Sequence, residues 1–182
     1  MQLHLGCGKR YIPGFVHVDL DDFPHIDYRS SIDKLPMFGN ETVDLIYCCH
    51  AFPYFDRVQA LEVLGEWRRV LNPGGILRIA VSDFGALARI YQTTGDLSQI
   101  LGPLFGRIVI QTLEGKTVLY ERTTYDYRSL ETLCLQAGFR SFRHYDWRQT
   151  IHKDYDDHSQ AYIPHMDKEH GQLISLNVEA VK

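Results

Sequence analysis

The sequence predicts an α/β protein built on a parallel β-sheet. Strand-like and helix-like segments alternate along the 182 residues, which is typical of parallel sheets with crossover helices. The run Ile76–Phe84 is apolar almost throughout, as expected of a strand that is buried on both faces. No internal repeat, low-complexity segment or linker interrupts the chain, so we expect one domain over residues 1–182.

The first part of the chain contains four expected strands and one helix. The strands are expected at Gln2–Leu5, Phe15–Leu20, about Ile26–Ile32 and Val43–His50. The helix is expected over Arg57–Leu71, where apolar residues recur at helical spacing. The "NPGG" stretch Asn72–Gly75 then breaks this helix.

The second part of the chain begins with the fifth strand, Ile76–Phe84, and a helical segment at Gly85–Thr94. A further helix is expected at Tyr127–Ala137, with Asp126 as its N-cap and Gly138 just after its end. The last two strands are expected at Phe139–Trp147 and Ile174–Val181.

Charge and composition argue against several classes of protein. The chain has 19 Lys and Arg against 23 Asp and Glu, a formal net charge of −4, so no nucleic-acid-binding face is indicated. No stretch approaches the length of a membrane span, and the N-terminus lacks a signal-peptide pattern. The 4 cysteines form no CxxC motif, which favours reduced, buried thiols in a cytoplasmic protein over a zinc site or a disulfide framework.

Two features predict a ligand site at the carboxyl edge of the sheet. The Gly6–Gly8 turn "GCG" lets backbone N–H groups approach a ligand closely, because it presents little side-chain bulk. Asp19 ends the second strand, where a carboxylate accepts hydrogen bonds from a ribose diol. A tight strand-exit turn and a solvated loop acid are the structural alternatives, and Asp21 and Asp22 fit the second of these better.

The connection between the first two strands is short. In a dinucleotide-binding fingerprint the acid follows about 20 residues after the glycines, whereas Asp19 follows Gly8 after only 11 positions. A crossover connection needs about 10–12 residues, and Pro13 and Gly14 limit any helix here to about one turn. We therefore expect a shortened first helix. The absence of GxGxxG also argues against an NAD-dependent oxidoreductase.

Four pieces of sequence resemble the class I S-adenosylmethionine-dependent methyltransferases, and in particular the short bacterial type 11 group. They read "LHLGCG", "VHVDL", "DKLPMFGNETVDLIYCCHAFPYF" and "EWRRVLNPGGILRIAVSDF". Their order and spacing are specific, and the similarity extends from Gln2 to about Gly138. The resemblance implies a Rossmann-like seven-stranded sheet whose last strand is antiparallel, and S-adenosyl-L-methionine as the cofactor.

The resemblance also implies roles for residues at the first two strands. Gly6, Cys7 and Gly8 would wrap the methionine part of the cofactor. Asp19, which is followed by Leu20 in the same binding segment, would hold the ribose hydroxyls.

Further roles follow from the resemblance for residues later in the chain. Ile32 and Asp33 would flank the adenine, and Cys49 and His50 would lie beside the amino acid and the methyl group. A hydroxyl acceptor needs a general base, most often a histidine, so His50 is the first catalytic candidate. Asp83, at the end of the fifth strand, is the second. A structural histidine bonded to the backbone is the alternative for His50.

The sequence departs from the family pattern at three places. The family usually has an acid at the position of His4 and a third glycine at the position of Arg10. It often has His-x-x-Glu-His after the fourth strand, where this chain reads "HAFPY" from His50 to Tyr54. These departures favour the alternative that the protein binds S-adenosylmethionine without catalysing a reaction.

The connector Arg148–Leu173 is expected at the active-site face. The sixth strand should end at the cofactor edge, and the antiparallel last strand should begin there, so the connector between them should lie over the mouth of the site. The same reasoning places Gly85–Asp126 at that edge. The connector is expected to contribute few core residues, so we expect that deleting Lys153–Lys168 leaves the sheet folded. A solvated surface loop is the alternative, and no ligand spacing indicates a metal site.

These observations predict a methyltransferase that acts on a small polar acceptor. The connector is rich in aromatic and hydrogen-bonding side chains, which suits a sugar, and His152, His158 and His165 are further base candidates. The resemblance to the type 11 group suggests O-methylation of a sugar or sugar-bearing intermediate in surface polysaccharide biosynthesis. This substrate class depends on analogy with the family.

Overall fold

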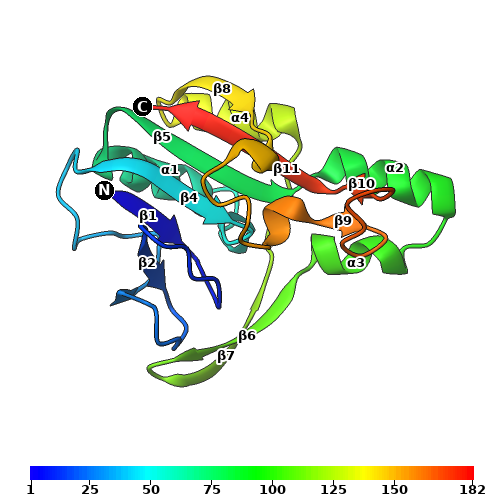
Figure 1. Cartoon of the computed structure of the whole chain (residues 1–182), viewed down its shortest axis with the longest axis horizontal. Coiled ribbons are helices and arrows are strands. Elements are labelled where there is room, and N and C mark those ends of the chain that lie inside the picture. The colour runs from blue at the N-terminus through cyan, green and yellow to red at the C-terminus, as the bar shows by residue number, and fades with distance from the viewer.

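The core of the protein is a seven-stranded β-sheet, seen in a computed structural model that describes residues 1–182 (Figure 1). The strand order is β3-β2-β1-β4-β5-β11-β8. The strands are β1 Gln2–Leu5, β2 Val16–Asp19, β3 Tyr28–Arg29, β4 Val43–Cys49, β5 Leu71–Ser82, β8 Arg140–His144 and β11 Ser175–Val181. Only β11 runs antiparallel to its neighbours, β5 and β8, so the predicted mixed sheet with an antiparallel last strand is confirmed.

The "NPGG" stretch belongs to strand β5, whereas the sequence predicted that it would separate the helix from the strand. Helix α1, Gln59–Val70, ends where expected, but β5 begins at Leu71 and includes the stretch instead of starting after it. Leu71 pairs with Val43 across a register shift, and Gly74 has φ of +79°. The stretch is therefore an irregular start of the strand, where glycine permits the left-handed backbone.

Two helices cover one face of the sheet. Helix α1 buries Ala60, Val63, Leu64, Trp67 and Val70 against the apolar residues that alternate along the strands. Helix α4, Tyr127–Gln136, packs on the same core through Leu130 and Cys134. Its predicted N-cap is confirmed, because Asp126 and Ser129 form a reciprocal capping box. No helix in the chain is both long and apolar enough to span a membrane.

The other face of the sheet carries polar and aromatic residues. No helix lies between β1 and β2, so the shortened first helix that we expected is replaced by turns. Residues that pair across neighbouring strands form a line over six strands on this face. They are His17, His4, Tyr47, Arg78, Glu179 and Arg143. Within it, Nη2 of Arg78 lies 2.6 Å from Oε1 of Glu179.

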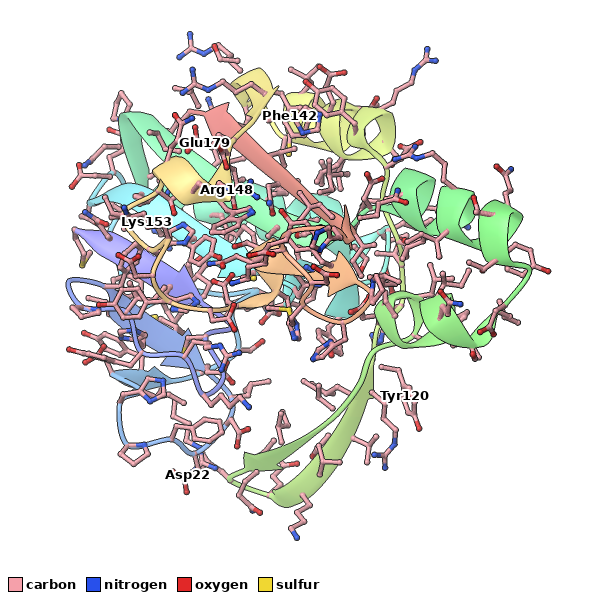
Figure 2. The ribbon with its side chains drawn as sticks, turned by 45° about the vertical axis from the view of Figure 1, so that its right-hand side comes forward. Asp22, Tyr120, Phe142, Arg148, Lys153 and Glu179 are labelled. Carbon is pink, nitrogen blue, oxygen red and sulfur yellow. The ribbon has the colours of Figure 1, made fainter.

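The connector Arg148–Leu173 covers this polar face. Figure 1 shows it crossing the near side of the sheet, while α1 and α4 lie on the far side, and Figure 2 labels Arg148 and Lys153 along its path. The His152 ring stacks on Tyr47 with 4.0 Å between centroids, and the Tyr47 hydroxyl donates to Oδ2 of Asp157 over 2.5 Å. His152 and Asp157 are both buried. The expectation that the connector contributes little to the core is therefore wrong.

Four short elements organise the connector. The 3-10 helix η2, Trp147–Gln149, starts it, and the 3-10 helix η3, His158–Gln160, brings it to the carboxyl edge of the sheet. Strands β9, Tyr162–Ile163, and β10, Gln172–Leu173, then form a small antiparallel pair. The segment therefore packs over the sheet face first and reaches the edge only in its middle.

The segment between β5 and α4 contains more structure than the sequence indicated. Helix α2, Phe84–Thr94, agrees with the expected helix, and α3, Ser98–Leu104, follows it. Strands β6, Arg107–Thr112, and β7, Gly115–Tyr120, then form an antiparallel hairpin. Figure 2 shows this hairpin running from Tyr120 near its root toward the loop around Asp22. There the Gln111 N–H donates to Oδ1 of Asp21 over 2.9 Å, and the Arg29 guanidinium donates to the Gln111 carbonyl.

Candidate functional site

The Gly6–Gly8 turn leaves β1 at the carboxyl edge of the sheet. Gly6 and Gly8 have φ of +65° and +52°, which favours glycine at both positions. A side chain on Gly6 would overlap the Cβ of Ala51 and come within 3.5 Å of Cδ1 of Ile32. At Gly8 no atom lies within 4 Å of the place that a Cβ would occupy. The turn is thus packed on one side and leaves open space on the other.

Asp19 is fixed beside this turn. Its Oδ2 accepts a hydrogen bond from the Gly8 N–H over 2.7 Å, and its Oδ1 accepts one from the Asp21 N–H over 2.9 Å. The side chain is buried, but each carboxylate oxygen retains a second lone pair for a ligand. The next residue, Leu20, is exposed. Burial and the charge of Asp19 raise the pKa of the Cys7 thiol, which therefore stays protonated.

Ile32 and Asp33 lie on two sides of the same loop. Ile32 is buried beside Gly6, and its carbonyl accepts a hydrogen bond from Nε1 of Trp67 over 2.7 Å. The Asp33 carboxylate accepts a hydrogen bond from the Ser31 hydroxyl and borders a groove along α1. Ile32 thus shares the surroundings of the turn, whereas Asp33 lies at the outer side of the loop.

Cys49 and His50 end β4 close to the connector. His50 has φ of +54°, and its Nε2 lies 3.2 Å from Oγ of Ser175. Its ring meets that of His158 edge-on at 5.4 Å. Burial and the nearby His158 lower the pKa of His50 to about 3, so the ring is neutral at pH 7 and is a weak base. Burial and Asp157 raise the pKa of Cys49 well above its usual value.

Asp83 has a structural role at the start of α2. Its Oδ1 accepts a hydrogen bond from the Gly85 N–H over 2.9 Å as the helix N-cap. The residue also borders a cavity of about 190 Å³ at the carboxyl end of β5. The cavity is lined by Asp83, His144, Tyr145, Asp146, Trp147, Arg148, Leu173, Ser175, Leu176 and Asn177. Ser175 belongs both to this lining and to the surroundings of His50.

Sequence reasoning did not indicate that the β6–β7 hairpin ends close to the segment after β4, where Glu121 follows β7. Pro53 and Tyr54 stand where the family pattern has Glu-His, and they form the 3-10 helix η1, Phe52–Tyr54. The Arg122 N–H donates to the Pro53 carbonyl over 2.8 Å, which brings the end of the hairpin to η1. No local pattern marks Glu121, because its proximity to Tyr54 depends on the hairpin.

The structure brings part of the predicted cofactor set together at the Gly6–Gly8 turn. Gly6, Gly8 and Asp19 form one unit, and Ile32 and Ala51 pack against it. A turn with glycine at two of its three positions, beside a fixed carboxylate with free lone pairs, fits the methionine and ribose parts of S-adenosylmethionine. No group of three or more His, Cys, Asp or Glu side chains is arranged to hold a metal ion.

Comparisons with known proteins give one family match and several solved structures of similar fold. Residues 13–79 match the family model described as a methyltransferase domain. A search of curated proteins finds no match. Solved structures of similar fold include an S-adenosylmethionine-dependent methyltransferase from Mesorhizobium loti, at 15% identity and a TM-score of 0.55, with 100% of this chain and 90% of that chain covered. A methyltransferase from Methanosarcina mazei has 14% identity and a TM-score of 0.54, with 100% and 91% covered.

A third structure contains bound ligands. It is the Burkholderia thailandensis 1,6-didemethyltoxoflavin-N1-methyltransferase, with 1,6-didemethyltoxoflavin and S-adenosylhomocysteine bound. It shares 12% identity with this chain at a TM-score of 0.56, with 100% of this chain and 70% of that chain covered. At these identities the similarity shows the fold. Residues 13–79 thus match a methyltransferase domain, and the chain as a whole has the fold of S-adenosylmethionine-dependent methyltransferases. S-adenosylmethionine is the cofactor of this class.

Proposed function

We propose that the protein methylates a hydroxyl group of a small polar acceptor, a sugar or a sugar-bearing intermediate of surface polysaccharide biosynthesis. The observation that carries this proposal is the cavity of about 190 Å³ beside Ser175. Its lining combines the Trp147 ring with charged and amide groups such as Arg148 and Asn177. An aromatic surface with several hydrogen-bonding groups around it suits the apolar face and the hydroxyls of a sugar.

The cofactor residues follow from the same geometry. In the proposed arrangement Gly6, Cys7 and Gly8 hold the methionine part, and Asp19 accepts hydrogen bonds from the ribose hydroxyls, with Leu20 beside it. Ile32 and Asp33 contact the adenine. When bound, S-adenosylmethionine supplies a methyl group that is already activated on a sulfonium.

The remaining task of the protein is to align the acceptor. Orientation alone contributes up to about 7–11 kcal/mol in well-aligned intramolecular reactions. We propose that Cys49 and His50 border the methyl group, and that neutral His50 positions the acceptor through a hydrogen bond with the help of Ser175. The predicted roles of His50 and Asp83 as bases are less favoured, because His50 has a low pKa and Asp83 caps α2.

The proposal also includes the setting of the reaction. The chain would act as one methyltransferase domain over residues 1–182, with residues 148–173 forming the acceptor side of the site. All four cysteines are free, as expected in the reducing cytoplasm, where we propose that the protein acts.

Transfer of an isotope-labelled methyl group tests the acceptor class. The protein is incubated with S-adenosylmethionine labelled on its methyl group and with a panel of methyl glycosides, amines and carboxylic acids. We expect the label as a methyl ether on a glycoside, and we expect Trp147→Ala to reduce this transfer while S-adenosylhomocysteine binds as before. Tyr11→Ala, at an exposed position away from the cavity, is the control. Label only on amines or acids would contradict the proposal.

A further inference from the structure

The β6–β7 hairpin carries a large share of exposed apolar side chains. Of its residues only Ile110 is buried, whereas Ile108, Val109, Val118 and Tyr120 are between 39% and 53% exposed. A two-stranded hairpin is marginally stable in water by itself, and apolar surface of this kind marks a place where a ligand or a partner binds. The contacts at the two ends of the hairpin indicate which of these it is.

The tip of the hairpin is joined by hydrogen bonds to the proposed ribose acid. The Gln111 N–H donates to Oδ1 of Asp21 over 2.9 Å, and the Asp21 N–H donates to Oδ1 of Asp19 over 2.9 Å. Oδ2 of Asp19 in turn accepts from the Gly8 N–H over 2.7 Å. A chain of three hydrogen bonds therefore connects the hairpin tip with the Gly6–Gly8 turn.

The root of the hairpin is attached to a second segment that contacts the same turn. The Arg122 N–H, just after β7, donates to the Pro53 carbonyl over 2.8 Å. Pro53 follows shortly after Ala51, whose Cβ occupies the place that a side chain on Gly6 would take. The hairpin thus spans between two segments that both contact the proposed cofactor turn (Figure 2).

The register of the hairpin shows which backbone groups lie along its anchored edge. Gln111 directs both its N–H and its C=O away from β7, to Asp21 and to Arg29. Backbone polar groups alternate in direction along an antiparallel strand, so Val109 directs its N–H and C=O to the same side, where no protein group binds them. Its cross-strand partner Val118 directs the same groups to the opposite edge of the hairpin.

The two faces of β6 differ in the same way. Side chains alternate along a strand, so Ile108 shares a face with the buried Ile110, and Val109 lies on the other face. Burial of Ile110 identifies its face as the one that is turned toward the body of the protein. Ile108 belongs to that face and still remains 39% exposed, so an apolar side chain on the inner side of the hairpin has no protein cover.

We propose that the β6–β7 hairpin forms the outer wall of the cofactor site, with bound S-adenosylmethionine between it and the Gly6–Gly8 turn. In this arrangement Ile108 packs on the adenosine part, and the free backbone groups of Val109 form hydrogen bonds with it. This inference rests on the cofactor arrangement proposed above. Entry and release of the cofactor then require the hairpin tip to leave Asp21.

Binding of S-adenosylhomocysteine to two neighbouring variants tests this wall by calorimetry. We expect Ile108→Ser to weaken binding about ten-fold, because the ligand loses an apolar contact. Val109→Ser is the matched control. It also replaces an exposed β-branched residue by serine in the same strand, but on the other face, and it keeps the backbone groups. Its affinity should equal that of the wild-type protein.

Hydrogen exchange of single amides in the wild-type protein is a second measurement, and it needs no substitution. Addition of S-adenosylhomocysteine should slow exchange of the Val109 amide, which lies on the anchored edge of the hairpin. The Val118 amide, on the opposite edge, should exchange equally fast with and without the ligand. This measurement decides the question if Ile108→Ser does not fold.

Failure of the inference is distinguishable from failure of the proposed function. Equal affinities of Ile108→Ser and Val109→Ser, or a Val109 amide that does not respond to the ligand, overturn the inference and leave the proposed function intact. No binding of S-adenosylhomocysteine to the wild-type protein overturns both. Protection of the Val109 amide that rises with protein concentration and not with ligand assigns this edge to a second copy of the chain, and it also overturns the inference.

Discussion

At the scale of single residues, Asp19 links the structure of the turn to the proposed ribose site. Asp19→Ala removes both carboxylate oxygens, so a bound ribose loses its acceptors. We expect the affinity for S-adenosylhomocysteine to fall by roughly ten- to a hundred-fold, equivalent to about 1–3 kcal/mol. Calorimetry measures this loss. Asp22→Ala is the matched control, because Asp22 is exposed and makes only a 3.5 Å ion pair with Arg29. Unchanged affinity in Asp19→Ala would remove Asp19 from the site.

Alanine substitutions at Gly6 and Gly95 separate the energetic cost of a left-handed backbone from the cost of steric overlap. Their φ values are +65° and +66°, but only Gly6 has a neighbouring side chain in the position of a Cβ. We expect Gly95→Ala to cost about 1 kcal/mol of unfolding free energy through its backbone alone. Gly6→Ala should cost about 1–3 kcal/mol more, because Ala51 must move. Urea unfolding of the two variants measures the difference, and equal losses would show that Ala51 moves without cost.

At the scale of elements, the connector contributes to stability through its contact with Tyr47. The Tyr47 hydroxyl donates to Asp157, whose other oxygen accepts from the N–H and hydroxyl of Ser159. Tyr47→Phe leaves a buried carboxylate oxygen without this donor, so we expect a loss of about 1–3 kcal/mol in urea unfolding. Tyr11→Phe is the control, because Tyr11 is an exposed tyrosine. Equal stability of both variants would show that Asp157 is satisfied by Ser159 alone.

Deletion of Lys153–Lys168 now has a different expected result. The deleted segment includes the buried residues Asp157, Ser159, Gln160 and Tyr162, and its loss would uncover Tyr47. We therefore expect the deletion variant to be partly unfolded, with a broad thermal transition and exposed apolar surface that binds a hydrophobic dye. A sharp transition near that of the complete chain would show that the sheet is stable without its cover.

Local interactions explain which elements the sequence predicts well. The α4 cap depends on Asp126 and Ser129, which are three residues apart, and the helical spacing of α1 is visible within its own residues. The Gly6–Gly8 turn and Asp19 were found because strand ends are local features. Burial of His152 depends on Tyr47, far away in the sequence, and the hairpin has few turn signals apart from Gly115. The contact of Arg122 with Pro53 at the end of the hairpin was missed for the same reason.

At the scale of the whole molecule, buried histidines should make stability depend on pH. Burial lowers the pKa of His4 well below 6.5 and that of His152 to about 4. Both rings are neutral in the folded protein, whereas the unfolded chain binds a proton to each below about pH 6.5. Stability is therefore complete above that pH and falls as the pH drops toward 4. Each histidine contributes up to about 1.4 kcal/mol per pH unit in this range.

Urea unfolding between pH 7.5 and pH 5 measures this dependence. Glu121 acts in the opposite direction, because its raised pKa makes the folded protein lose stability as the pH rises from about 4.5 to about 7. Substitution of single histidines in the connector isolates the contribution of the histidines. His152→Phe should flatten the loss of stability at acidic pH, whereas His170→Phe, an exposed control in the same connector, should leave it unchanged. Identical slopes in both variants would exclude His152 as a cause.

The position of the connector also has an evolutionary consequence. The same 26 residues shield the polar sheet face through His152 and Asp157 and contribute Arg148 and His158 to the proposed site. A substitution that adapts this segment to a new acceptor therefore acts on a segment that also holds the protein together. Where one segment covers a sheet and another lines the site, the two properties can change independently. We expect acceptor preference in proteins built like this one to diversify slowly, or only after mutations elsewhere have added a reserve of stability.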